Sequence, residues 1–349
     1  MKIKSPDGCI AHQYSFVTIN LPKTGRRVVK YMVFIRTPRF NRSVKTQHIR
    51  VTSRDLHIIH HVFKYRLLNS KQIATLTEGS HQNLLRRLKL LYNNRYLDRP
   101  ISQLDYYRAG GSHPMIYALG NRGADLIQAK FGISRQEVDW TAKNRSVKRL
   151  FIQHTLSVSE ILVRLESACR SNDKVEFVGK EDALHRLAPH LQTCKQPKWN
   201  VRVSFEKSDV HIGIVPDYLF GLRLIDESMS IETVYFFLEV DRGTMPVMRK
   251  NLNQTSFYRK LLAYHETWRQ GLHTSLFGLK RFRVLVVVNS KKRLSHLIAA
   301  NKLLNDGKGS GIFLFASMSD VDSCENILNL PFIDGHGDST SSLLTDIGS

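Results

Sequence analysis

The residues best suited to chemistry are acidic and lie in the second half of the chain. Asp217 follows a proline within an apolar stretch, and Glu239 and Asp241 close another apolar stretch further on. Residues i and i+2 of a strand point to the same side, so Glu239 and Asp241 are expected to point together. Like charges placed in this way repel unless a cation lies between them, and such oxygens suit Mg²⁺ or Mn²⁺. The sequence therefore predicts Asp217, Glu239 and Asp241 as ligands of Mg²⁺ or Mn²⁺ in a site that cleaves phosphodiesters.

A basic group is needed beside these acids, and the next predicted helix supplies one. Pro216-Asp217 and Glu239-Val240-Asp241 resemble the PD-(D/E)xK signature of restriction-endonuclease-like nucleases, except that Asp241 replaces the lysine. Lys260 and Tyr264 are four residues apart and share a helical face. Lys260 could orient the nucleophile or balance phosphate charge, and Tyr264 or Tyr258 could bind the strand or act on the phosphate. Short motifs also arise by chance, so the alternative is a set of strand-edge acids facing solvent.

A long helix predicted over about 149–171 carries two further candidates. His154 could be a site histidine, a capping residue or a core contact, and Glu160 could lie beside the acids or on the surface. His57 and His61 share a helical face but lack further ligands, so no metal role is expected there. The sequence has no phosphate loop, dinucleotide fingerprint or serine-hydrolase elbow, which sets those three chemistries aside.

The elements around these residues predict an α/β domain with a central mixed sheet. The run FRVLVVVNS is typical of a buried strand. We expect strands at 174–178, 200–206, 210–223, 233–240, 282–290 and 311–317, and helices at 149–171, 250–271 and 293–304. The domain is placed at 149–333, and the polar tail 334–349 is expected to be disordered.

Positive charge is concentrated in the first half of the chain. Residues 1–150 hold 28 Lys and Arg against 8 Asp and Glu, a net of +20, whereas 151–349 hold 24 against 22, a net of +2. An excess placed in this way indicates a polyanionic partner, usually DNA or RNA. A membrane would attract the same charge, but no apolar run of about 18 residues, signal peptide or lipidation motif is visible. Four scattered cysteines fit a reducing cytoplasm, so we predict a cytoplasmic nucleic-acid-binding protein.

The first half also has the element order of a DNA-binding module. Residues 1–50 are expected to form a basic β-hairpin, at 11–37, and a linker. Three helices and then two strands over 51–131 indicate an α+β winged helix-turn-helix, with a basic connector at 132–148. A protein-interaction module, or a charged face that is only solvated, would show the same order. The predicted DNA contacts are Gln82, Asn83, Arg86, Arg87 and Lys89 on the third helix and Arg99, Arg108 and His113 on the wing.

Taken together, these parts resemble the replication-relaxation proteins over about residues 50–300. The resemblance is carried by TSRDLHIIHHVFKYRLLNSKQIATL, HQNLLRRLKLLYNNRYLDR, HPMIYALGNRGADLI, His154-Thr155-Leu156, Pro216-Asp217, Glu239 to Gly243, and Lys260 with Tyr264. That family is related to the MobC-type relaxases of mobilisable plasmids. The resemblance implies a restriction-endonuclease-like domain that nicks DNA at a transfer origin with a divalent metal. It makes Asp217, Glu239 and Asp241 the metal ligands and Lys260 the displaced lysine.

The leading hypothesis is therefore a nickase of a plasmid or mobile element, which acts with other mobilisation or replication proteins. Its catalytic residues would be Asp217, Glu239, Asp241, Lys260, Tyr264 and His154. One rival is a non-catalytic origin-binding regulator of replication or transcription, because the lysine of the motif is missing. Another is a double-strand endonuclease of a defence or transposition system. Both enzyme hypotheses require Asp217 to lie beside Glu239.

Overall fold

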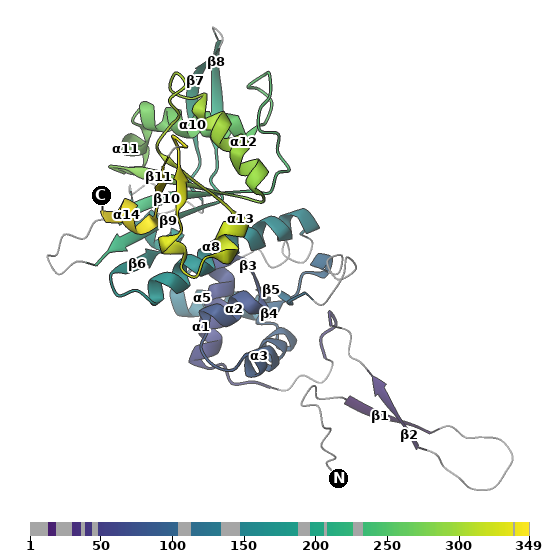
Figure 1. Ribbon diagram of the computed structural model, residues 1–349. Helices are drawn as coiled ribbons and strands as arrows, with labels where there is room; N and C mark the ends of the chain where they lie inside the picture. Colours follow the sequence, from purple (N-terminus) through teal and green to yellow (C-terminus); the bar gives the residue numbers. More distant parts are fainter. Residues whose placement is uncertain are drawn as a thin grey trace, which may run out of the picture.

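A computed structural model describes residues 13–18, 30–35, 39–43, 48–103, 113–133, 147–187, 196–205, 208–225, 233–337 and 339–348. These residues form a helical unit with a three-stranded sheet and a larger unit built on a seven-stranded sheet (Figure 1). The protein is thus a mixed α+β structure, and the predicted central mixed sheet is confirmed.

In the described residues, the helical unit consists of four helices around a small sheet. They are α1 (Ser53–Tyr65), α2 (Ser70–Leu76), α3 (His81–Asn93) and α5 (Asn121–Phe131), with strands β3 (Leu67–Asn69), β4 (Leu97–Asp98) and β5 (Ile116–Leu119) in the order β3-β5-β4. Capping boxes begin α1 and α2, where Asp55 and Gln72 reach back to the N-cap backbone of Thr52 and Asn69. These local hydrogen bonds fix where the first two helices begin.

The larger unit is built on one mixed sheet. Its strands are β6 (Val175–Val178), β9 (Tyr218–Leu224), β10 (Thr233–Asp241), β11 (Phe282–Val288), β12 (Phe313–Ser317), β13 (Phe332–Asp334) and β14 (Thr340–Ser341). They lie in the order β14-β13-β12-β11-β10-β9-β6. β10, β11 and β12 are parallel, and the other neighbours pair antiparallel. Three carboxyl strand ends therefore meet at one edge of the sheet.

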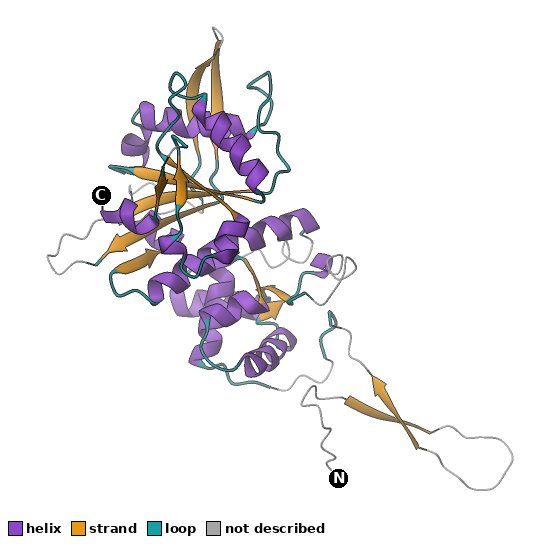
Figure 2. Ribbon diagram, viewed as in Figure 1, coloured by secondary structure: helices purple, strands orange, loops and turns teal. Residues whose placement is uncertain are grey.

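Helices cover both faces of this sheet (Figure 2). The long helix α8 (Arg149–Arg170) packs on one face, where even-numbered residues of β10 such as Phe236 lie in its core cluster. The helices α10 (Phe257–Arg269) and α12 (Lys291–Lys302) pack on the other, with odd-numbered residues such as Phe237. Shorter elements complete the unit: α9 (Lys180–Arg186), α11 (Leu272–Phe277), α13 (Met318–Ser323) and the hairpin β7 (Trp199–Phe205) with β8 (Ser208–Ile214).

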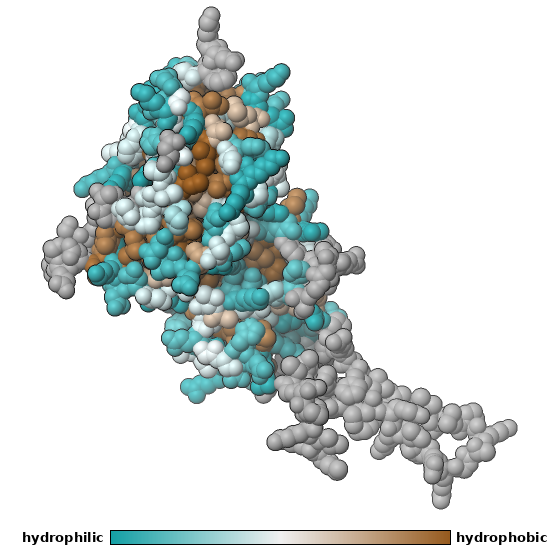
Figure 3. Space-filling model, in the orientation of Figure 1, coloured by the Kyte–Doolittle hydropathy of each residue, from teal (hydrophilic) through white to brown (hydrophobic). Residues whose placement is uncertain are grey.

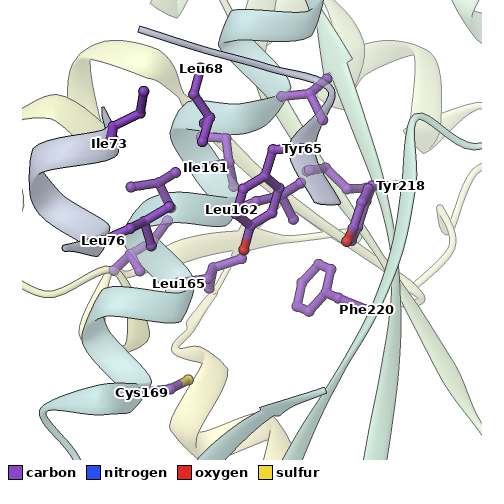
Figure 4. Close-up of a cluster of buried hydrophobic side chains, with 14 of the residues drawn as sticks. Tyr65, Leu68, Ile73, Leu76, Ile161, Leu162, Leu165, Cys169, Tyr218 and Phe220 are labelled. Carbon is purple, nitrogen blue, oxygen red and sulfur yellow. The ribbon is translucent and has the colours of Figure 1, made fainter. Parts of the chain in front are cut away.

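The two units share one hydrophobic core. Tyr65 and Leu68 of the helical unit pack with Leu162 and Leu165 of α8 and with Phe220 of β9 (Figure 4). The hydroxyl of Ser159 on α8 also donates to the carbonyl oxygen of Leu67 at 3.0 Å. The helical unit is therefore packed onto the sheet unit through α8.

A buried acid lies at the same junction. Glu166 of α8 accepts hydrogen bonds from Lys64 Nζ at 2.8 Å, from the hydroxyl of Tyr65 and from the guanidinium of Arg170. Burial opposes its ionisation, but the charge and hydrogen bond of Lys64 and the bond from Tyr65 lower the pKa of Glu166 to about 2. The carboxylate is thus held ionised between the two units.

Two predictions about the chain need correction. The expected strand 210–223 is two strands, because the chain turns at Val215–Asp217 between β8 and β9. The expected disordered tail instead forms β14 and the helix α14 (Leu343–Gly348), because Leu343 and Ile347 are buried in the core. Within residues 11–37, where the sequence predicts a hairpin, β1 (Gln13–Thr18) pairs antiparallel with β2 (Lys30–Ile35). Most of the predicted connector, 134–146, lies outside the described residues.

Among the described residues, no helix has both the length and the apolar character needed to cross a membrane. Hydrophilic side chains cover most of the face drawn in Figure 3, and apolar ones gather there in small patches.

Candidate active site

Glu239 lies near the carboxyl end of β10, with its side chain buried against α10. Its Oε2 accepts a hydrogen bond from Lys260 Nζ at 2.6 Å, and its Oε1 accepts one from the hydroxyl of Tyr264 at 2.8 Å. Lys260 and Tyr264 are one helical turn apart, so both reach the same carboxylate. Glu239 is only 1% exposed, and these two donors replace the water it has lost.

Asp217 is bonded to the same strand from the turn that precedes β9. Its backbone N–H donates to the carbonyl oxygen of Leu238 at 3.1 Å, and its Oδ2 accepts from the N–H of Val240 at 2.8 Å. Its Oδ1 lies 3.0 Å from Nε2 of His154, which comes from α8 on the opposite face of the sheet. The structure thus brings Asp217, His154, Glu239, Lys260 and Tyr264 to one edge of the sheet.

The charges in this cluster act on one another. Burial raises the pKa of Glu239 to about 7, against the opposing charge of Lys260, and Asp217 raises it further. The hydrogen bond to Asp217 raises the pKa of His154. Burial opposes ionisation of Asp217, but His154 and the charge of Lys260 lower its pKa. Asp217 is therefore held as a carboxylate, whereas Glu239, with its raised pKa, is protonated more readily than an ordinary glutamate.

Asp241 points to the same face as Glu239, as its position in the strand predicts, but has another cation as its partner. Its Oδ2 accepts from Nε of Arg293 on α12, and its Oδ1 accepts from the N–H of Gly243 at 3.1 Å. Arg293 also donates to the carbonyl oxygen of Met245 at 2.6 Å. Asp241 is thus neutralised by Arg293 and holds the chain that follows β10.

A divalent cation needs several oxygen ligands close together. Within the described part of the chain, no group of three or more His, Cys, Asp or Glu side chains is gathered closely enough to hold a metal ion. Mg²⁺, however, is usually held by one or two carboxylates together with substrate phosphates. Asp217 and Glu239 are two such carboxylates, and a cation would favour the charged form of Glu239. The most exposed side chains of the cluster are those of His154, Lys260 and Asp217, at 36%, 30% and 16%.

Glu160 lies outside this cluster. It accepts hydrogen bonds from Gln72 Nε2 at 3.0 Å and from Arg164 Nε at 2.9 Å, on the part of α8 that faces α2. Sequence reasoning missed Arg293, which is the partner of Asp241. A possible signal was its place in the first turn of the helix that follows a buried strand, since parallel neighbours bring such turns to the edge where the acids lie.

The third helix presents the polar face that the sequence predicts. Leu84, Leu88 and Leu91 are buried. Gln82, Asn83, Arg86 and Lys89 are exposed, as are His81 and Leu85. Two hydrogen-bonding amides and two cations therefore lie on one solvent-facing surface of α3.

Two of the predicted DNA contacts have partners inside the protein. Arg87 Nε donates to Oδ1 of the buried Asp55 at 2.7 Å, and its NH2 donates to the carbonyl oxygen of Arg50 at 2.7 Å. The guanidinium of Arg99 lies over the ring of Tyr92, 4.2 Å from its centroid. Both side chains therefore stabilise the helical unit.

The wing is described only in part. His113 is exposed, just before β5. Arg108, the remaining predicted contact, lies outside the described residues.

Comparison with known proteins bears on both units. No curated protein and no solved structure matches this chain. A family model described as Replication-relaxation matches residues 56–279. The match runs from α1 to the residues just after α11, and so covers the polar face of α3 and the cluster around Glu239. The chain therefore belongs to the replication-relaxation family.

Proposed function

We propose that this protein is a DNA-binding relaxase that nicks one strand at the origin of a plasmid or mobile element with a divalent metal ion. Family membership supports a role in plasmid replication or mobilisation. The single observation that carries the cleavage step is the cluster in which Asp217 and Glu239 lie beside Lys260.

In this proposal the helical unit is a winged helix-turn-helix and α3 is its recognition helix. Gln82 and Asn83 near its N-terminus can hydrogen-bond base edges, and Arg86 and Lys89 can contact phosphates or bases. The strong positive charge of the first 150 residues supports the same role, because phosphate neutralisation supplies most of the affinity of such proteins.

The sheet unit would act as a restriction-endonuclease-like nuclease. Asp217 and Glu239 would hold Mg²⁺ or Mn²⁺, and the ion would supply charge stabilisation for phosphodiester cleavage. Lys260 is charged, because Glu239 and Asp217 raise its pKa against the effect of burial. Its ammonium would balance charge on the scissile phosphate. Tyr264 would orient Glu239, and His154 would orient Asp217 through the hydrogen bond at Nε2.

One observation favours a second candidate function, a non-catalytic origin-binding protein. Arg293 pairs with Asp241, so two of the three predicted ligands, Asp217 and Glu239, are left for a cation, and both already take part in hydrogen bonds within the protein. In that case the acids would only stabilise the fold, and α3 would still bind DNA.

The test is incubation of the full chain with supercoiled plasmid that carries its cognate origin region, in Mg²⁺, Mn²⁺ or EDTA. The proposal expects open circles that need metal and disappear with Asp217→Ala. Glu160→Gln is the matched control, because this acid lies outside the cluster, and it should nick normally. Linear product would assign a double-strand endonuclease. Tight binding without cleavage in any metal would assign the non-catalytic protein.

A further inference from the structure

A pocket lies at the opposite edge of the sheet from the candidate active site. Val234, Phe282 and Ile312 line it at the amino ends of the parallel strands β10, β11 and β12. Glu239, in contrast, lies near the carboxyl end of β10. The pocket has a volume of about 610 Å³, within the range of about 300–1,000 Å³ typical of small-ligand sites. It is therefore separate from the acids.

Positive charge dominates the lining of this pocket. Arg269, Arg281 and Arg283 line it together, and none of its described lining residues is acidic. Arg269 extends from the end of α10 with a side chain that is 62% exposed, although it also pairs with Glu266. Arg283 also donates to the carbonyl oxygen of Gly311 in the pocket wall. The planar donors of guanidinium groups match phosphate oxygens. The lining therefore suits an anion that carries phosphate.

A glycine-containing loop forms one wall. Gly309 has φ +75°, and a Cβ there would come within 2.7 Å of the carbonyl oxygen of Gly335. A Cβ on Gly311 would lie 2.9 Å from Nε2 of His336. The loop can pack this closely only because these residues lack side chains. Its Ser310 hydroxyl lies 3.0 Å from Nδ1 of His265, so hydroxyl and imidazole groups add to the polar lining.

An aromatic ring is held in the same lining. Trp268 is 39% exposed and stacks on His273, with ring centroids 4.5 Å apart and an angle of 13° between planes. The ring of Phe282 supports it edge-on at 5.8 Å. A fixed, partly exposed aromatic ring beside cations is the usual platform for a nucleic-acid base. Bases in a duplex are already stacked on each other, so such a platform favours a single strand.

We propose that this pocket binds one nucleotide of a single-stranded DNA segment, with the arginines on its phosphate and Trp268 against its base. This binding site depends neither on the acids around Glu239 nor on the duplex-binding role of α3. It gives the protein a contact for unpaired DNA at the far edge of the sheet.

The test measures binding of a fluorescein-labelled oligothymidylate to the full chain by fluorescence anisotropy. The background carries Arg86→Ala and Lys89→Ala, which remove the cations of α3. Trp268→Ala and Arg269→Ala are each expected to weaken binding about tenfold. Trp268→Phe keeps an aromatic ring and should stay within about twofold of the background protein. Lys174→Ala removes one charge from an exposed residue outside the pocket and should have no effect.

Thermal unfolding of each variant separates lost binding from lost structure. Unchanged affinity in both Trp268→Ala and Arg269→Ala would overturn the proposal, as would an equal loss with Lys174→Ala. Free dTMP is added as a competitor in a second arm. Displacement by oligothymidylate but not by dTMP supports a strand site, whereas displacement by dTMP at the same concentrations would assign the pocket to a free nucleotide and overturn the DNA assignment. None of these outcomes changes the nicking test, which depends on Asp217.

Discussion

The carboxylate of Glu239 lies 2.6 Å from the ammonium of Lys260, yet burial still raises its pKa to about 7. One positive charge therefore offsets only part of the cost of burying this acid. Asp217 adds a like charge that acts in the same direction. A cation bound beside Glu239 and Asp217 would therefore favour the charged form of Glu239.

The first prediction concerns pH and Glu239. Its pKa is about 7 in the folded protein, against 4.5 as the ordinary value, so the folded state binds the proton more tightly. Wild-type stability should therefore fall as pH rises from about 4.5 to 7. Glu239→Gln cannot ionise at this position, so the variant lacks this loss. The unfolding free energy of the variant minus that of wild type should therefore be about 2–3 kcal/mol larger at pH 8 than at pH 5.

Urea unfolding at several pH values measures this effect. Glu160→Gln, at a half-exposed acid outside the cluster, should follow the wild-type pH dependence. Parallel curves for Glu239→Gln and wild type would contradict the raised pKa.

The second prediction concerns the pair Asp241 and Arg293. Arg293→Met leaves a buried carboxylate without its cation and should lower the unfolding free energy by about 3 kcal/mol. Asp241→Asn in the same chain should restore much of that loss, because no buried charge remains. A double-mutant cycle with urea unfolding checks the pair, and additive losses would show that the two side chains do not interact.

The third prediction concerns Glu166 at the junction of the units. Its lowered pKa, about 2, means that its contribution is present above about pH 4.5 and is lost as pH falls towards 2. Glu166→Gln should therefore cost about 2–4 kcal/mol at pH 7 and progressively less in acid. Unfolding free energies at pH 7 and pH 3 measure this difference, and a loss that does not change with pH would count against an ionised Glu166.

The fourth prediction separates Arg86 from its neighbour Arg87. Arg86 is exposed, so Arg86→Ala should weaken duplex binding and reduce the slope of log affinity against log salt by about one, with little change in stability. Arg87→Ala leaves the buried Asp55 without its guanidinium and should cost about 3 kcal/mol in unfolding free energy. Salt-dependent anisotropy and urea unfolding of both variants test this contrast. Equal stability losses would contradict it.

Residue spacing alone predicted which side chains around Glu239 share a face. The i and i+2 positions of Glu239 and Asp241 and the i and i+4 positions of Lys260 and Tyr264 fix which side chains share a face, whatever lies around them. The burial of Leu84, Leu88 and Leu91 in α3 follows from the same periodicity.

The partners of these residues could not be predicted in this way. Arg293 reaches Asp241 only because β10 and β11 are parallel neighbours, and strand order is not encoded in local periodicity. Arg87 was predicted as a DNA contact because its partner, Asp55, is 32 residues away in the sequence and no local pattern indicates the pair. The tail was predicted to be disordered because its overall composition is polar. It packs because two apolar residues, Leu343 and Ile347, reach the core.

The common core beneath α1 and α8 has a geometric consequence. If α3 holds a duplex while the acids around Glu239 act on it, the DNA-binding surface and the cleaving surface are held together by the contacts of Tyr65, Ser159 and Glu166 across the shared core. The number of base pairs between the recognised sequence and the cleaved bond would then be constant.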